Sequence, residues 1–178
     1  MSIKTKKLCV TAVGIALFVA FSLCLQVPVF ENYYLCLGYV VMAVYCWSFG
    51  AVSGTAVGVL GVVLYCLVIS GLRGMPGWAL GNAVIGIALG LTFRKTRGMR
   101  NTALAMAFNV AAIGASVTVG ILVVKSLTES LLYAQPFLIR VGKNVYAWVA
   151  DLVMLILSLP ICLPLHKAAE KLFPELVK

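Results

Sequence analysis

The sequence has few charged side chains and almost no acidic ones. Of its 178 residues only 11% are charged and only 5 are Asp or Glu, whereas 63% are hydrophobic. Soluble globular domains carry charge on about a quarter of their residues. This composition therefore excludes a water-soluble fold, and most of the apolar surface must face a lipid bilayer.

The sequence also lacks the motifs of common hydrolases. It has no GxxxxGK[ST] phosphate-binding loop, no GxSxG nucleophile turn and no HExxH zinc motif, and its one histidine is His166. Asp151 is the only acidic residue inside an apolar block, so no Ser/His or paired-aspartate arrangement exists. We expect that the chain is not an enzyme and holds no cofactor or metal of its own.

The cysteines show neither a CxxC pair nor a paired histidine at metal-ligand spacing. They occur singly inside apolar blocks, where a free thiol behaves as a small hydrophobic side chain. We interpret all six as packing residues: Cys9, Cys24, Cys36, Cys46, Cys66 and Cys162.

Six apolar blocks fill nearly the whole chain, and no segment between them is long enough to fold as a soluble domain. A bilayer span needs about 20 mostly apolar residues. The blocks cover residues 8–25, 33–49, 51–69, 78–93, 102–124 and 145–165. The sequence therefore predicts an all-α, multi-pass membrane protein with six transmembrane helices in a single domain, residues 1–178, and a tight turn near Gly50 between the second and third helices.

The net charge of +9 is distributed unevenly between the two sides that this topology creates. With a cytoplasmic N-terminus, the inner segments hold ten cations: Lys4, Lys6, Lys7, Arg94, Lys95, Arg97, Arg100, Lys167, Lys171 and Lys178. The outer loops hold four: Arg73, Lys125, Arg140 and Lys143. This excess follows the positive-inside rule, so we expect both termini in the cytoplasm of a cell-membrane protein. No aromatic residues interleave with the cations, so we expect no nucleic acid partner.

Small residues recur at helical spacing, which indicates where helices approach closely. Gly54, Gly58 and Gly61 form one stripe, Gly86 and Gly90 another, and we expect both to pack inside the bundle. Ala12, Ala16 and Ala20 form an AxxxAxxxA ridge on the first helix. That ridge is a candidate for contact with a partner helix.

Polar side chains at membrane depth are costly and usually face the bundle interior or a cavity. Asn144, Trp148 and Asp151 share one face of the sixth helix, and Trp78 and Asn82 lie one turn apart on the fourth. Two such helices could line a pocket for a planar polar ligand near the outer surface. The alternative interpretation makes Asn82, Asp151 and also Asn109 interhelical contacts and the tryptophans interfacial anchors.

Two outer loops are candidates for a lid over such a pocket. Residues 26–34 are rich in aromatic side chains, and residues 125–143 carry Glu129, Tyr133 and Arg140. Aromatic and hydrogen-bonding groups at the outer face are the kind of side chain that orients a small molecule.

Three segments resemble a known family: KLCVTAVGIALFVA at residues 7–20, GYVVMAVYCWSFGAVSGTAVGVLG at 38–61, and GMPGWALGNAVIGIALG at 74–90. They are similar to the substrate-binding S component of energy-coupling factor (ECF) transporters, which import vitamins and related micronutrients. The resemblance covers nearly the full chain, including the six spans and the alanine ridge. It implies capture of a vitamin at the outer face by this chain.

The resemblance also implies partners and site residues. A transmembrane coupling subunit (T component) would dock on Ala12, Ala16 and Ala20, with Gly14 and Gly58 assisting close approach, and two cytoplasmic ATPase subunits would use ATP. The pocket would be built from Trp78, Asn82, Asn144, Trp148 and Asp151, with Tyr33, Tyr34 and Arg140. The tryptophans favour a flat heteroaromatic ring, and Asp151 offers one negative charge. The sequence does not choose between several ligands: riboflavin, pyridoxine, hydroxymethylpyrimidine, thiamine and cobalamin-like molecules.

A different class of function remains as an alternative. Small multi-span bundles also serve as non-transporting membrane scaffolds, such as the cell-shape protein MreD. A scaffold predicts no outward ligand pocket and no need for Asn144, Trp148 and Asp151 on one face.

Overall fold

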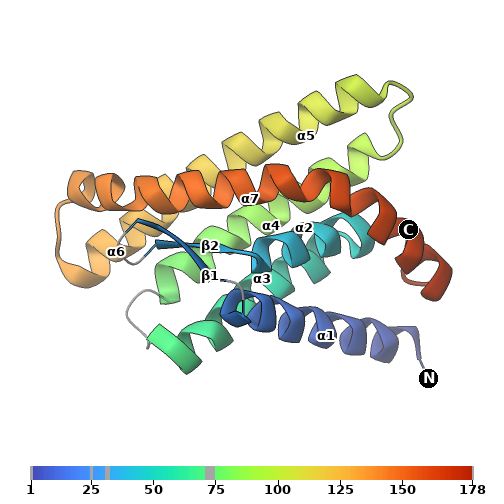
Figure 1. Cartoon of the computed structure of the whole chain (residues 1–178), viewed down its shortest axis with the longest axis horizontal. Coiled ribbons are helices and arrows are strands. Elements are labelled where there is room, and N and C mark those ends of the chain that lie inside the picture. Colours follow the sequence, from blue (N-terminus) through green and yellow to red (C-terminus); the bar gives the residue numbers. More distant parts are fainter. Residues whose placement is uncertain (1, 25, 31–32, 71–74, 178) are drawn as a thin grey trace.

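A computed structural model of the chain describes residues 2–24, 26–30, 33–70 and 75–177. Its elements follow in the order α1 (Ile3–Cys24), β1 (Gln26–Phe30), β2 (Tyr33–Cys36), α2 (Gly38–Phe49), α3 (Ala51–Tyr65), η1 (Cys66–Ser70), α4 (Met75–Thr96), α5 (Thr102–Val117), η2 (Thr118–Lys125), α6 (Ser126–Tyr133) and α7 (Phe137–Leu172). Figure 1 shows an elongated helical bundle with β1, β2 and α6 at one end and both termini at the other. We call these the hairpin end and the terminal end.

The described helices confirm the predicted six-helix membrane fold. Five of them are long and apolar enough to cross a bilayer, and α2 is a shorter apolar helix. The π-helical segments η1 and η2 continue α3 and α5, and α6 extends the latter as far as Tyr133. Counted this way, the bundle has six rods, of which α2 packs against α7 and α3 while α1 packs against α3 and α2.

The predicted start of the second helix is wrong. Residues 33–36 form strand β2, which pairs antiparallel with β1 so that Val27 lies opposite Leu35, and α2 begins only at Gly38. A short apolar run has the same hydropathy in a strand as in a buried helix, so periodicity could not separate the two.

The predicted loop at residues 125–143 is also wrong. Helix α6 continues to Tyr133 and α7 begins at Phe137, so the connection shrinks to residues 134–136, where Ala134 adopts a left-handed φ of 49°. Hydropathy shows only where the apolar part of a helix ends. The helix itself can continue into the interface, because it still satisfies its own backbone hydrogen bonds there. At 1.5 Å per residue, the 36 residues of α7 span about 54 Å, well beyond a hydrocarbon core of about 30 Å.

The tight turn predicted near Gly50 is present. Gly50 ends α2 and precedes α3 with a φ of 85°, a conformation that costs glycine little because it has no Cβ. The turn lets two apolar helices fold back on each other without a polar loop.

The glycine stripes pack inside the bundle, as predicted. A Cβ at Gly61 would lie 2.5 Å from the Phe18 ring, and one at Gly86 would lie 2.7 Å from Thr55 Oγ1. Such approaches allow close van der Waals packing between helices, which takes the place of a hydrophobic drive in lipid.

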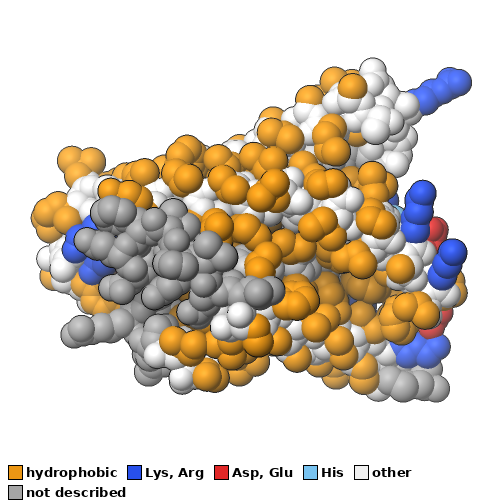
Figure 2. Space-filling view, viewed as in Figure 1, with side chains coloured by type: hydrophobic (Ala, Val, Ile, Leu, Met, Phe, Trp, Pro, Cys, Tyr) orange, Lys and Arg blue, Asp and Glu red, His pale blue; other side chains and the backbone are white. Residues whose placement is uncertain are grey.

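Charged side chains gather mainly at the terminal end, while hydrophobic side chains cover the middle of the visible face (Figure 2). There Lys6 Nζ lies 2.6 Å from Glu175 Oε1 and ties the start of α1 to the C-terminal segment. The two termini therefore lie on the same side of the bundle, as an even number of spans requires.

Candidate functional site

Three predicted site residues meet at the hydroxyl of a buried tyrosine toward the hairpin end. Trp78 Nε1 donates a hydrogen bond to the Tyr39 hydroxyl at 2.8 Å. The same hydroxyl lies 2.8 Å from Asn82 Oδ1 and 2.9 Å from Asp151 Oδ2. We call Tyr39, Trp78, Asn82 and Asp151 the Tyr39 cluster. It joins α2, α4 and α7, and all its members except the partly buried Trp78 are buried.

The position of Tyr39 follows from its surroundings. It is the second residue of α2, directly after the glycine that begins the helix, and its ring packs edge-on against Phe18 of α1 at a centroid distance of 6.3 Å. On α4, Trp78 and Asn82 lie one turn apart and so face the same hydroxyl. Asn82 is fixed on its other side, because its Nδ2 donates to the Gly58 carbonyl at 3.0 Å.

A second polar cluster joins α6 to α7 at the hairpin end. Asn144 Nδ2 donates to Ser126 Oγ at 3.0 Å and to Glu129 Oε2 at 3.1 Å. Arg140 Nη1 forms a salt bridge with the same Glu129 oxygen at 3.6 Å, and its guanidinium lies 4.9 Å from the centre of the Tyr133 ring. We call Ser126, Glu129, Arg140 and Asn144 the Glu129 cluster.

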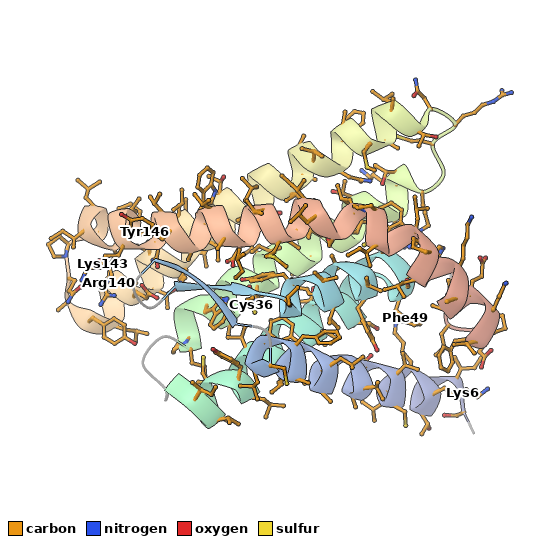
Figure 3. The ribbon with its side chains drawn as sticks, viewed as in Figure 1. Lys6, Cys36, Phe49, Arg140, Lys143 and Tyr146 are labelled. Carbon is orange, nitrogen blue, oxygen red and sulfur yellow. The ribbon has the colours of Figure 1, made fainter. Side chains whose placement is uncertain are left out.

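Arg140 keeps one donor unused in this arrangement. Its Nε is buried and has no hydrogen-bond partner within the described part of the chain, although the side chain as a whole is 19% exposed. Figure 3 places Arg140 with Lys143 near α6, far from Lys6 at the terminal end. A buried guanidinium N–H is costly to leave unpaired, so it is suited to an acceptor on an incoming molecule.

Trp148 turns its polar atom away from both clusters. Its Nε1 donates to Thr118 Oγ1 of η2 at 3.0 Å. The face predicted for α7 therefore exists, but its members have separate partners: Asn144 joins the Glu129 cluster, Asp151 joins the Tyr39 cluster, and Trp148 contacts η2.

Tyr33 and Tyr34 belong to β2 by their backbone, opposite Phe30 and Pro28 of β1, and their side chains lie outside the described residues. At the end of β2, Cys36 Sγ lies 3.0 Å from Ser22 Oγ of α1. Burial raises the pKa of the Cys36 thiol to about 11, so it stays a neutral group that ties the hairpin to α1.

No metal centre forms in the described ranges, where no group of three or more His, Cys, Asp or Glu side chains comes together. Asn109 lies outside both clusters, because its Oδ1 accepts a hydrogen bond from Thr96 Oγ1 at 2.7 Å near the α4–α5 connection. For Asn109 the structure supports the interpretation as an interhelical contact.

Sequence reasoning missed Tyr39 altogether and named Glu129 only as a loop residue. The available signal for Tyr39 was a hydroxyl-bearing side chain inside an apolar block, since such a group needs a partner at membrane depth. Its partners are at positions 78, 82 and 151, and no periodicity within one helix connects residue 39 with these positions.

The alanine ridge lies on the outer face of α1. Ala12, Ala16 and Ala20 are exposed, whereas Gly14 and Phe18 are buried on the opposite face. A Cβ at Gly14 would lie 2.5 Å from Tyr45 Cζ. The expectation that Gly14 and Gly58 assist an external contact is therefore wrong, because both glycines serve packing within the bundle.

Comparisons with known proteins match almost the whole chain. The model of the family described as ECF-type riboflavin transporter, S component, matches residues 2–169. Two UPF0397 proteins of Streptococcus thermophilus, from strains CNRZ 1066 and ATCC BAA-491 / LMD-9, are each 25% identical over 172 residues, which cover 94% of this chain and 93% of the relative.

A solved structure shares the fold. It is the crystal structure of the S component for biotin from an ECF-type ABC transporter, which superposes with a TM-score of 0.60 at 18% identity and covers 94% of this chain and 95% of its own. At this identity the likeness concerns the fold alone, and it agrees with the six-helix bundle described above.

Proposed function

Because the chain belongs to the ECF-type riboflavin transporter S component family, we propose that it captures a flat heteroaromatic vitamin at its hairpin end and delivers it to separate coupling and ATPase subunits. The observation that carries this proposal is the convergence of Trp78, Asn82 and Asp151 within 2.9 Å of one buried hydroxyl. Buried hydrogen-bonding groups of this kind determine how a small molecule is oriented.

Family membership decides between the classes of function that the sequence left open. S components are substrate-binding subunits of transporters, so this multi-pass membrane protein is not an enzyme. Family membership also favours a transporter subunit over a scaffold. A scaffold would not need polar clusters on the helices toward one end of the bundle.

The two polar clusters supply different contacts to a ligand. The Tyr39 cluster offers neutral hydrogen-bonding groups and the indole of Trp78, whose other side packs against Tyr65 at a centroid distance of 5.7 Å. The Glu129 cluster adds the free Nε of Arg140. A planar ring system with hydrogen-bonding edges fits this combination, and riboflavin, which the family description names, is the first ligand to test.

The orientation in the membrane follows from the charge distribution. Nine of the 12 described Lys and Arg residues lie in the N-terminal, α4–α5 and C-terminal segments, which belong to the terminal end, and Lys178 lies outside the described residues. The positive-inside rule then assigns the terminal end to the cytoplasm and the hairpin end to the outside.

The alanine ridge supplies the surface for the coupling subunit. Small exposed residues at i, i+4 and i+8 let another helix approach closely, and Ala12, Ala16 and Ala20 meet this requirement. ATP would be used by the cytoplasmic partners, since this chain has no phosphate-binding motif.

The test is equilibrium binding of riboflavin, biotin, thiamine and pyridoxine to the purified chain, with two matched asparagine variants. Asn82→Ala should weaken binding by about tenfold or more, because a lost buried hydrogen bond costs about 1–3 kcal/mol. Asn109→Ala is the control, because this residue is equally buried but lies near the α4–α5 connection. Equal effects of the two variants would contradict the proposed location of the site.

A further inference from the structure

The Tyr39 hydroxyl has one proton and two lone pairs, and its neighbours use them in a fixed way. Trp78 Nε1 can only donate, so it occupies one lone pair. Asn82 must present Oδ1 to the hydroxyl, because its Nδ2 faces the Gly58 carbonyl, which can only accept. Asn82 Oδ1 is therefore an acceptor that needs the single proton of Tyr39.

Asp151 Oδ2 is the third neighbour, at 2.9 Å. An ionised carboxylate accepts hydrogen bonds only, and Tyr39 has no second proton to give it. A carboxylic acid at this position donates to the remaining lone pair, and every polar atom that faces the Tyr39 hydroxyl then has a partner. A buried unpaired acceptor would cost about 1–3 kcal/mol, and more for a charged group.

None of the other described charged or titratable groups around Asp151 donates a hydrogen bond to its carboxyl group. No Lys, Arg or His of the described residues lies within salt-bridge distance of it. Lys125 of η2 favours the ionised form of Asp151 electrostatically but forms no ion pair with it, and Cys36 of β2 is a neutral thiol. Asp151 itself is 5% exposed, so an ionised side chain would lose most of its hydration.

Glu129 on α6 shows the opposite environment, beside Asn144, which lies two turns along α7 from Asp151. Both of its polar neighbours are donors, Asn144 Nδ2 at 3.1 Å and Arg140 Nη1 at 3.6 Å. Glu129 therefore differs from Asp151, whose hydroxyl neighbour has a single proton that Asn82 Oδ1 also needs.

We propose that Asp151 is a neutral carboxylic acid that donates to the Tyr39 hydroxyl, and that Tyr39 is the positioning residue which holds Trp78, Asn82 and Asp151 together. The ligand then meets no fixed negative charge from Asp151, which favours an uncharged ring edge over a cationic one. This last step rests on the proposed function, whereas the state of Asp151 does not.

The experiment uses the fact that Asp151 is the only aspartate in the chain. Cell-free synthesis with isotope-labelled aspartate, labelled at the side-chain carboxyl carbon, gives an infrared signal from this one group in the intact ligand-free protein. At neutral pH we expect the isotope shift in the C=O band of a protonated acid. A shift confined to the carboxylate bands overturns the proposal.

Two variants test the role of Tyr39. Tyr39→Phe keeps the ring but removes the hydroxyl, so the labelled acid band should move because its hydrogen-bond partner is gone. Glu129→Gln is the control and should leave the labelled band unchanged. An unmoved band in folded Tyr39→Phe overturns the positioning role, and the wild-type spectrum decides the protonation state even when a variant fails to fold.

The ligand step has a separate measurement. Riboflavin is uncharged and thiamine is a cation, so the wild-type chain should bind riboflavin at least about tenfold more tightly, a difference of about 1.4 kcal/mol. Tighter binding of thiamine overturns the inferred ligand charge. If none of riboflavin, biotin, thiamine and pyridoxine binds while the acid band is present, the proposed function fails and the assignment of Asp151 stands.

Discussion

The Tyr39 cluster and the alanine ridge differ in burial, polarity and packing, although one side chain of α1 connects them. Tyr39, Asn82 and Asp151 are at most 5% exposed and share one set of hydrogen bonds. Ala12, Ala16 and Ala20 are exposed and have no polar atom in their side chains. Our proposal assigns the first region to ligand capture and the second to contact with a partner helix.

The connection runs through Phe18. This residue is fully buried on the inner face of α1 and contacts the Tyr39 ring, while the ridge occupies the outer face of the same helix. The surfaces proposed for capture and for docking are therefore separate, and the ring of Phe18 links them. Variants on one surface should spare the function of the other unless they displace Phe18.

The largest expected effect is on transport. Ala16→Trp places a bulky side chain on the ridge, so a partner helix can no longer approach closely. Vitamin uptake by cells should be abolished, while binding by the purified chain stays at the wild-type value. Leu157→Trp, on an exposed position of α7, is the control and should transport normally.

The next effect is on ligand affinity. Tyr39→Phe leaves Trp78, Asn82 and Asp151 without their common partner, which should weaken binding by about tenfold to a hundredfold. Isothermal titration of the purified variant measures this loss. Wild-type affinity in the variant would remove Tyr39 from the site.

The two faces of α1 can be compared directly by thermal unfolding. Gly14→Leu forces a side chain toward Tyr45, where even a Cβ would lie 2.5 Å from the ring, and overpacking of this kind costs about 1–3 kcal/mol. Ala16→Leu adds similar volume to the exposed face and should leave Tm nearly unchanged. Equal losses of Tm would contradict the assigned orientation of α1.

A smaller effect is expected at Trp148. Its indole N–H donates to Thr118, whose own hydroxyl still donates to the Gly114 carbonyl at 2.7 Å. Trp148→Phe should therefore change ligand affinity by only about threefold, since one neutral hydrogen bond contributes about 0.5–1.5 kcal/mol. A loss as large as that of Tyr39→Phe would bring Trp148 into direct contact with the ligand.

The smallest effect concerns the partly exposed ion pair of Lys6 and Glu175 at the terminal end. The hydrogen bond from Lys6 lowers the pKa of Glu175 below its ordinary value of 4.5. Its contribution to stability is thus complete above pH 4.5 and is lost as the pH falls through the lowered pKa. Lys6→Gln should remove this part of the acid dependence of Tm, and an unchanged acid profile would contradict the pairing.

Much of the fold could be predicted from the sequence, because hydropathy alone limits the options for a chain that must hide so much apolar surface. The six helices, the turn at Gly50 and the internal glycine stripes followed from this. The hairpin at residues 26–36 did not, since strand and helix are equally apolar there. The start of α7 at Phe137 could not be predicted either. Hydropathy detects only the part of a helix inside the hydrocarbon core, and a helix can extend beyond it.

The candidate site could be predicted only in part, for a related reason. Polar residues at membrane depth identified Asn82, Asn144 and Asp151, since each needs a partner. Which partner each one has depends on how separate helices meet. Tyr39 was therefore not predicted. The three residues predicted to share one face of α7 contact three different elements: Asn144 contacts α6, Trp148 contacts η2 and Asp151 contacts α2.

The central claim, capture by the Tyr39 cluster, is tested most directly by native mass spectrometry of the chain purified from cells grown in rich medium. We expect a bound heteroaromatic vitamin on the wild-type chain and on Ala16→Trp, and none on Asn82→Ala. A wild-type chain without ligand that also binds none of the vitamins tested, or an adduct that persists in Asn82→Ala, would contradict this account.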